Sequence, residues 1–342
     1  MKSPLTYPFP DPPEHGSATE VADGILWLRF PLPMALDHVN VYALDDGDGW
    51  TVIDTAMDTR RTRETWGRVL DGPLMGKPLN RVLVTHHHPD HMGLAGWLQN
   101  DHGAELMTTR TAWLFARMLQ LDAQDRPSAE TVDFWRSAGM DADLLAQRME
   151  ERPFNFADTV APMPLGFTRI VEGQTLHIGA RDWTVRMGNG HAPEHATLWS
   201  TDVVIGGDQL LPSISPNLGV YATEPQADPV ADWLEACERL SAHATPEQLV
   251  LPGHKLPFRG LPTRLTQLID NHHGALGRLK IFLTTPHTAA ECFQPLFMRP
   301  IREGEYGLAL VEAMAHVLHL WHAGQASRTR RDDGAWLWQA KD

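Results

Sequence analysis

Histidine and aspartate side chains crowd one short segment of the chain. The apolar run Val82-Leu-Val-Thr85 leads directly into His86-His87-His88-Pro89-Asp90-His91. Imidazole nitrogens and carboxylate oxygens are the ligands that borderline divalent metals such as Zn²⁺ prefer. Pro89 fixes its own φ and keeps His88 out of the helical region, so these side chains can spread from a tight loop. The segment therefore predicts a metal site.

The spacing inside this segment indicates two metals. In an extended stretch, positions two apart point to the same side, so His86 and His88 should face one metal together. Asp90 and His91 follow the proline and should point elsewhere, toward a second metal. The alternative is a polar loop that is rich in histidine without binding a metal.

Three later turns each present one further candidate ligand, namely His191, Asp208 and His254. Each of these residues directly follows a glycine, and the runs before Asp208 and His254 are apolar and strand-like. One such turn would be weak evidence. Four ligand-bearing segments in a single chain make a metal centre the favoured interpretation.

From about residue 20 to 258 the chain resembles the metallo-β-lactamase-fold hydrolase superfamily, in which an H-x-H-x-D-H motif precedes single His, Asp and His ligands. The resemblance implies a first metal between His86, His88 and His191, a second between Asp90, His91 and His254, and Asp208 bridging the two. This complete set is similar to the glyoxalase II type of site. Classical β-lactamases replace some of these ligands.

The same resemblance implies supporting roles for two further residues. Asp54 matches an acidic position that braces the metal site by accepting a hydrogen bond from a ligand imidazole. A turn or helix-cap role for Asp54 is the alternative. His195 matches a second histidine of the third motif and is expected to support the site or the fold without binding metal. Glu194 departs from the family, which more often has glycine there, so this loop is expected to be less permissive.

Two such metals share a water molecule, lower its pKa and polarise a carbonyl or phosphoryl oxygen. Asp208 and Asp90 are the predicted catalytic carboxylates, because Asp208 would hold the cations together and Asp90 would orient the nucleophile. The expected cofactors are two divalent ions. Zn²⁺ is the expected metal because imidazoles and carboxylates suit it, and iron and manganese are alternatives.

The expected enzyme is a metal-dependent hydrolase that is similar to hydroxyacylglutathione hydrolases. It would hydrolyse a thioester of the acyl-glutathione or acyl-CoA type by means of a metal-bridging hydroxide. One alternative is an endoribonuclease or other phosphodiesterase, and another is a lactonase or weak β-lactamase. A non-enzymatic metal-binding module is disfavoured because all seven expected ligands are present.

The elements around the motifs predict an α/β fold. Strand-like runs cover residues 25–30, 39–44, 50–54, 81–85, 169–171, 175–178, 183–187, 199–206 and 249–251, and helical spacing covers 60–70, 92–99 and 229–243. The resemblance implies an αββα metallo-β-lactamase sandwich, two sheets between layers of helices. Residues 1–258 are predicted to form this catalytic domain.

A helical insertion is expected at about residues 111–160, because the core of the superfamily does not require it. Its helices are predicted at 111–119, 129–138 and 143–150. Trp113 and Phe115 belong to an apolar surface that would contact an acyl group, and Tyr221 in a later loop is a further candidate for substrate contact. The alternative is that these residues only pack the insertion against the body.

Residues 259–342 change to a helical pattern and are predicted to form a small second domain. Helices are expected at 263–284, 289–297 and 306–323, before a short strand at 335–338. Three helices and a β-wing resemble the winged-helix domain that is attached to one branch of the superfamily. The basic turn carries Arg328, Arg330 and Arg331, for which packing or dimerisation is favoured over nucleic acid binding.

The composition limits the partners. The 342 residues carry a formal charge of −14, which disfavours nonspecific binding of polyanions. No apolar run reaches about 18 residues and no secretory signal core opens the chain, so a cytoplasmic protein without a membrane partner is expected. Cys237 and Cys292 match no metal spacing and are expected to be buried thiols. A small-molecule substrate and a homodimer complete the expected partners.

Overall fold

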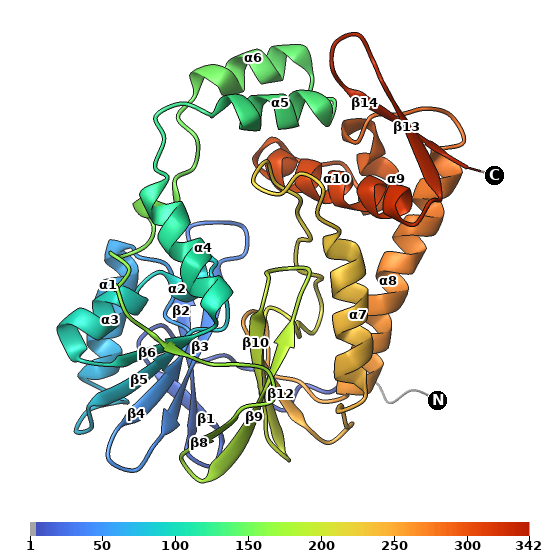
Figure 1. Ribbon diagram of the computed structural model, residues 1–342. Helices are drawn as coiled ribbons and strands as arrows, with labels where there is room; N and C mark the ends of the chain where they lie inside the picture. The colour runs from blue at the N-terminus through green and yellow to red at the C-terminus, as the bar shows by residue number, and fades with distance from the viewer. Residues whose placement is uncertain (1–4, 342) are drawn as a thin grey trace. The chain divides into compact units, whose positions relative to one another are not determined.

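The computed structural model describes residues 5–341, which form two compact units (Figure 1). The first unit holds the residues up to 123, 155–216 and 240–265, and the second holds 124–154, 217–239 and the residues from 266 onward. Segments that are distant in sequence therefore meet in each unit. The predicted sequence boundary between residues 258 and 259 stays a prediction.

The first unit contains two β-sheets. The seven-stranded sheet keeps chain order: β1 (Ala18–Ala22), β2 (Ile25–Pro31), β3 (His38–Asp45), β4 (Trp50–Ile53), β5 (Leu79–Leu83), β6 (Glu105–Thr108) and β7 (Thr168–Arg169). The five-stranded sheet has the order β12 (Leu249–Pro252), β11 (Val203–Gly207), β10 (His195–Trp199), β9 (Arg181–Gly188) and β8 (Thr175–Ile178). The strands β4 to β7 pair in parallel, as do β11 and β12.

Alternation along the central strands produces two apolar cores. Trp27 contributes to the core that the two sheets share, together with Trp183 and Leu198 of the second sheet. Its neighbour Leu28 points to the opposite face and joins a core with the helices, which includes Trp66. Both faces of the seven-stranded sheet are thus buried, and the two-sheet sandwich predicted from the sequence is present.

Helices of the first unit cover the seven-stranded sheet, and two of them begin at a side-chain cap. They are α1 (Arg60–Leu70), α2 (Pro89–Met92), α3 (Ala95–His102) and α4 (Arg110–Leu121), with a 3₁₀ turn η1 at Phe156–Asp158. Thr59 and Thr109 accept hydrogen bonds from the first turns of α1 and α4. Trp66 of α1 is fully buried, and burial of a large apolar side chain contributes about 1.5–3 kcal/mol.

Two predicted elements are wrong in detail. The helix predicted over residues 92–99 is divided into α2 and α3, because the backbone leaves the helical conformation at Leu94, where φ is −108° and ψ is 12°. The strand predicted over 199–206 is the hairpin of β10 and β11. The hydroxyl of Ser200 accepts the backbone N–H of Val203 there and closes the turn.

The second unit is mainly helical. It contains α5 (Ala129–Ser137), α6 (Ala142–Glu150), α9 (Phe293–Phe297), α10 (Tyr306–His322), the hairpin β13 (Ala326–Arg330) and β14 (Trp336–Ala340), the 3₁₀ turns η2 (Ala290–Cys292) and η3 (Glu303–Glu305), and most of α7 (Pro229–Ser241) and α8 (Leu261–Phe282). The helices predicted in the insertion and near the C-terminus are confirmed, and so is the hairpin. The winged-helix assignment stays a prediction.

Two further sequence expectations can be compared with the structure. Cys237 and Cys292 are both buried free thiols, as expected. Among residues 5–341, no helix has the length and apolar character needed to cross a membrane.

Candidate metal centre

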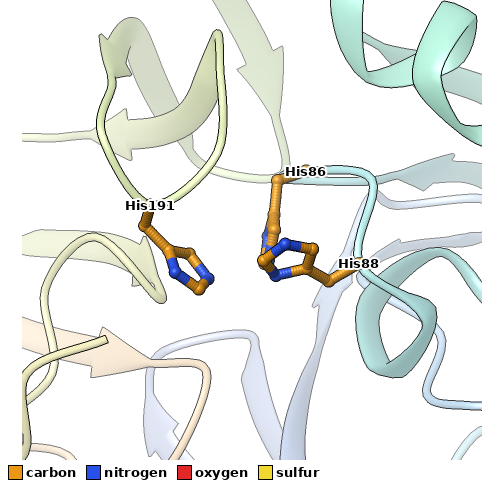
Figure 2. A group of neighbouring side chains, drawn as sticks. All are labelled: His86, His88 and His191. Carbon is orange, nitrogen blue, oxygen red and sulfur yellow. The ribbon is translucent and has the colours of Figure 1, made fainter. Parts of the chain in front are cut away.

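The loops after β5, β11 and β12 and the β9–β10 turn bring the predicted ligands together in the first unit. Three groups of three side chains have ligand atoms within 4.8 Å of one another: His86, His88 and His191; His86, His91 and Asp208; and Asp90, His91 and His254. The imidazoles of the first group face a common space (Figure 2). The first and third groups are the two ligand groups that the resemblance implied.

Asp208 lies between these two groups. Its Oδ2 atom is 3.5 Å from Nε2 of His191 and 3.3 Å from Nε2 of His254. Its Oδ1 atom is 3.4 Å from Nε2 of His91. These separations are longer than ordinary hydrogen bonds and close to the distance of about 3.3 Å between neighbouring ligands of a tetrahedral zinc ion.

Buried atoms of the cluster that have no hydrogen bond within residues 5–341 include Nε2 of His91 and Oδ1 of Asp208. Buried polar atoms are nearly always satisfied, so a pair left in this state calls for an explanation such as an ion. Imidazole and carboxylate together form the donor set that Zn²⁺ accepts, and the cluster therefore fits a divalent metal.

Asp54 orients the second ligand group. Its Oδ2 atom accepts the Nδ1 proton of His91 over 2.7 Å. The carboxylate also accepts the backbone N–H of Thr85 at 2.8 Å and its hydroxyl at 2.9 Å. The hydrogen bond to Asp54 fixes a proton on Nδ1 of His91, so Nε2 is the atom that faces Asp208 and Asp90.

The last ligand, His254, is held in the same way by a backbone group. Its Nδ1 atom donates to the carbonyl oxygen of His38 over 2.7 Å. The loop that carries His254 is tied to β3 by Asn40, whose amide donates to the carbonyls of Pro252 and Lys255, each at 2.9 Å. Tyr42 donates a further hydrogen bond to Pro252. These contacts link the two sheets beside the ligands.

His195 supports the centre without joining a ligand group. Its Nε2 atom accepts the backbone N–H of Asp208 at 3.1 Å. Its ring stacks on that of His86 with centroids 4.5 Å apart. His195 is fully buried, so its contribution is to fix two ligands rather than to contact solvent or substrate.

Backbone strain is concentrated around the ligand loops. Asp54, Ala56, Glu194 and Lys255 have φ values of 66°, 68°, 49° and 70° although none is glycine. A left-handed conformation costs about 1–2 kcal/mol for such residues. Lys255 directly follows His254, and Glu194 lies three residues after His191. Asp54 contacts His91, and Ala56 follows Thr55, which donates to the carbonyl of His91. This is the pattern expected where the fold maintains a functional geometry.

The electrostatic environment favours positive charge at the centre. Burial and the neighbouring imidazoles hold the pKa of His86 and of His88 well below the ordinary value, so both present neutral nitrogens. Burial also disfavours charge on His254, but the carboxylates of Asp208 and Asp90 raise its pKa to about 10. Burial likewise opposes charge on His91, whose pKa is nevertheless raised by Asp208, Asp54 and Asp90. A divalent cation would supply the positive charge that these carboxylates attract.

The predicted substrate contacts have different surroundings. Phe115 on α4 packs against the ring of His87, with centroids 5.0 Å apart, and so lies beside the ligand loop. Trp113 instead stacks on Phe167 and donates to the carbonyl of Pro164, which is a packing role. Tyr221 belongs to the second unit and is about half exposed.

Sequence reasoning missed the residues that act through the backbone and through short polar side chains. His38 and Asn40 lie in a strand without a recognised motif, yet both are buried and both orient the loop of His254. Thr55 similarly joins β4 to the ligand loop through the carbonyl of His91. Polar residues inside an otherwise apolar strand were the available signal for His38 and Asn40.

Comparison with known proteins identifies the family. The profile of the Metallo-beta-lactamase superfamily matches residues 34–254. The chain belongs to the metallo-β-lactamase superfamily. The profile of the Metallo-beta-lactamase-like, C-terminal domain matches residues 277–341. The mixed α/β fold predicted from the sequence is confirmed, and the protein is a metal-dependent hydrolase of this superfamily.

Individual members of the superfamily are similar over nearly the whole chain. A probable metallo-hydrolase, YqjP of Bacillus subtilis (strain 168), is 25% identical over 308 residues, which cover 86% of this chain and 91% of the relative. The crystal structure of a beta-lactamase domain protein from Burkholderia ambifaria is 37% identical with a TM-score of 0.90 and covers 98% of both chains. The metallo-beta-lactamase family protein TTHA1429 from Thermus thermophilus is 26% identical with a TM-score of 0.77, covering 94% of this chain and 100% of the other.

Proposed function

We propose that this superfamily member hydrolyses thioesters at a centre of two divalent metals, most simply Zn²⁺. The observation that carries the proposal is the position of Asp208 between two groups of ligands, within 3.5 Å of His191, His91 and His254. A carboxylate in this position suits a centre of two metals, because it can neutralise and hold two cations at once.

The two groups would hold one metal each. His86, His88 and His191 would bind the first, and Asp90, His91 and His254 the second. When bound, the metals would lower the pKa of a coordinated water and polarise the carbonyl oxygen of the substrate. Iron and manganese are the alternative metals, and metal analysis distinguishes them.

The protein side chains prepare this centre by placing protons. Asp54 keeps the Nδ1 proton of His91, and the carbonyl of His38 keeps that of His254, so both Nε2 atoms face the acids. The backbone of Asp208 is held by His195. Asp90 Oδ2 lies 3.3 Å from His254 Nε2, where the carboxylate can also orient an attacking water.

A substrate with an acyl group is favoured by the apolar side of the ligand loop. Phe115 packs on His87, and α4 exposes Leu114, Met118 and Leu121 at helical spacing. An acyl chain is complementary to such a surface. The complete ligand set is the second support, because it resembles the glyoxalase II type of site.

The endoribonuclease alternative depends on the basic residues of the β13–β14 hairpin. Arg331 is paired with Asp333 at 2.7 Å. The guanidinium of Arg328 stacks on the rings of Trp321 and Trp336 at 4.1 and 4.5 Å from their centroids. Arg330 lies 5.2 Å from the centroid of Trp336, so all three arginines have partners within their own unit, which favours packing over phosphate binding. Cytoplasmic location and a homodimer are further proposals from the sequence.

The test is release of free thiol from S-lactoylglutathione, a short acyl-CoA and a long acyl-CoA by metal-loaded and chelator-treated protein. We expect chelator-sensitive release, and the preferred acyl group reports what α4 recognises. No release by protein with two bound metals would overturn thioester hydrolysis and direct the search to lactones and RNA.

A further inference from the structure

A cavity of about 430 Å³ lies in the first unit next to the loop of the last metal ligand. Its walls include the polar side chains of Tyr7, Arg29, Asp37, His38, Ser213 and Lys255. None of these side chains belongs to a ligand group of the metal centre. The cavity therefore requires its own explanation.

Positive charge exceeds negative charge in this pocket. Its ionisable walls are Arg29, Lys255 and Asp37, besides the imidazole of His38. Asp37 is 76% exposed and lies 3.6 Å from the Arg29 guanidinium, which is only 22% exposed. A solvent-screened contact of this length neutralises a cation weakly. In a chain with a formal charge of −14, a pocket with an excess of positive charge is unusual.

The hydrogen bonds of His38 leave Arg29 without a good acceptor. Nε2 of His38 accepts the backbone N–H of Lys255 at 2.9 Å, so the proton of this imidazole is on Nδ1. Nδ1 donates it to Asp37 at 2.6 Å. The guanidinium of Arg29 is 2.7 Å from the same Nδ1, but a protonated nitrogen cannot accept its hydrogen bond. The buried Nε of Arg29 also has no hydrogen bond within residues 5–341.

Lys255 is held at the pocket by its backbone. Its N–H donates to His38, and its carbonyl accepts from the Asn40 amide at 2.9 Å, with φ at 70°. Within residues 5–341, no carboxylate lies within 4 Å of its ammonium group. The fold thus maintains a strained residue that presents a lysine beside Arg29 and the metal ligand His254.

We propose that this pocket binds a carboxylate group. A guanidinium offers two parallel N–H donors that match a carboxylate, and the ammonium adds a second charge. The excess of one positive charge matches the charge of one carboxylate group. The hydroxyls of Tyr7 and Ser213 can donate hydrogen bonds, while Pro12 and Leu256 provide apolar walls for an aliphatic stem.

Two kinds of molecule could supply this carboxylate. Lys255 directly follows His254, and the His38 carbonyl that holds His254 belongs to the wall of the pocket. An acid at the far end of the hydrolysed substrate is one source, and this version rests on the proposed function. A free carboxylate that is not hydrolysed is the other.

The first experiment measures binding of succinate by calorimetry to the metal-loaded protein. We expect wild type to bind, Arg29→Gln and Lys255→Gln to weaken binding about tenfold or more, and Arg61→Gln, which removes an exposed charge elsewhere, to leave it unchanged. Metal content is measured in every variant. Absence of binding in wild type, unchanged binding in both pocket variants, or tighter binding of inorganic phosphate would overturn the carboxylate site.

The second experiment identifies the source. The KM and kcat for S-lactoylglutathione, which carries carboxylates, are compared with those for the neutral S-lactoyl-N-acetylcysteamine. A rise in KM of about tenfold in Arg29→Gln for the charged substrate alone assigns the site to the substrate's acid. If wild type and Arg29→Gln have equal KM values for S-lactoylglutathione while Arg29→Gln no longer binds succinate, the site belongs to a separate ligand. If neither thioester releases thiol, the proposed function fails, and the succinate measurement still decides the pocket.

Discussion

Nδ1 of His91 lies 2.7 Å from Oδ2 of Asp54, and both side chains are buried. Asp54 reaches this position with φ at 66°, a left-handed conformation that costs about 1–2 kcal/mol. The hydrogen bond decides which nitrogen of His91 carries the proton and therefore which one is open to a metal. The strained backbone of Asp54 thus places the carboxylate that orients His91 in the metal centre.

Asp54→Asn should weaken metal binding. The amide would turn an N–H group toward either Thr85 or His91, both of which donate to the carboxylate, so one hydrogen bond becomes a repulsion. A loss of about 10–100-fold in metal affinity is expected. Competition with a chromophoric chelator measures it, and Asp182→Asn at an exposed position serves as control. Equal affinity in both variants would exclude an orienting role for Asp54.

His87 and His88 are adjacent but should behave differently. His88 belongs to the first ligand group, while His87 packs against Phe115 and belongs to none of the three groups. His88→Ala should lower the bound metal by about one ion per chain and abolish hydrolysis. His87→Ala should keep the full metal content. Elemental analysis after dialysis decides, and loss of metal in His87→Ala alone would refute the ligand assignment.

Gly253→Ala should disrupt the centre. A Cβ atom at this position would lie 2.3 Å from Oδ1 of Asp208 and 2.8 Å from Cε1 of His91, both of which are buried. We expect loss of metal and activity with retained secondary structure. Gly67→Ala in α1, where nothing lies within 4 Å of the new Cβ, should be neutral or stabilise the helix by up to about 1 kcal/mol. Wild-type metal content in Gly253→Ala would contradict the close approach.

Glu194 should stabilise the junction between α4 and the loop of His191. Its Oε2 atom accepts the backbone N–H of Thr111 in the first turn of α4 at 3.0 Å, although its φ of 49° is unfavourable. Glu194→Ala should lower the free energy of unfolding by about 1 kcal/mol, because the cap is lost and the strain stays. Glu194→Gly should lose less, because glycine relieves the strain. Urea unfolding of both variants tests this, and a larger loss in the glycine variant would be inconsistent with it.

Glu312 in the second unit should make stability depend on pH. Burial raises the pKa of its carboxyl to about 7, although the Asn217 amide, 2.7 Å away, opposes the shift. The folded protein then keeps a proton that the unfolded chain releases near its ordinary pKa, so stability falls as pH rises from about 4.5 to 7.

Glu312→Gln removes this titration and keeps an acceptor for Asn217. Its Tm should exceed that of wild type at pH 8 and approach it at pH 5. The exposed Glu303→Gln should show no such difference. Parallel Tm curves for wild type and Glu312→Gln across pH 5–8 would show that the acid is not buried in its neutral form.

Much of the site could be predicted because metal ligands are local features of the sequence. The residue types at 86, 88, 90 and 91 and the glycine turns before 191, 208 and 254 are visible without a structure. The structure brings all seven side chains into three overlapping groups. The amphipathic helices of the insertion were equally visible, because helical periodicity is local as well.

Other features were not visible because they depend on contacts between distant segments. The strand predicted over residues 199–206 is an exception, because the polar residues Ser200, Thr201 and Asp202 already mark the turn between β10 and β11 in the sequence. The insertion predicted as one piece contributes α4 to the first unit and α5 and α6 to the second. The two compact units are defined by which residues lie close together in space, and this cannot be read from the order of residues in the chain.

The sequence by itself determined which side chains could form a metal centre and that the fold is an α/β sandwich. Only the tertiary structure decided how these groups are oriented. The carbonyl of His38 reaches His254 across 216 residues, and Asn40 ties the same loop to β3. The residue types of the candidate ligands can be read from the sequence. Which nitrogen of each histidine carries the proton, and which pocket has an excess of charge, depend on backbone and side-chain atoms that only folding brings together.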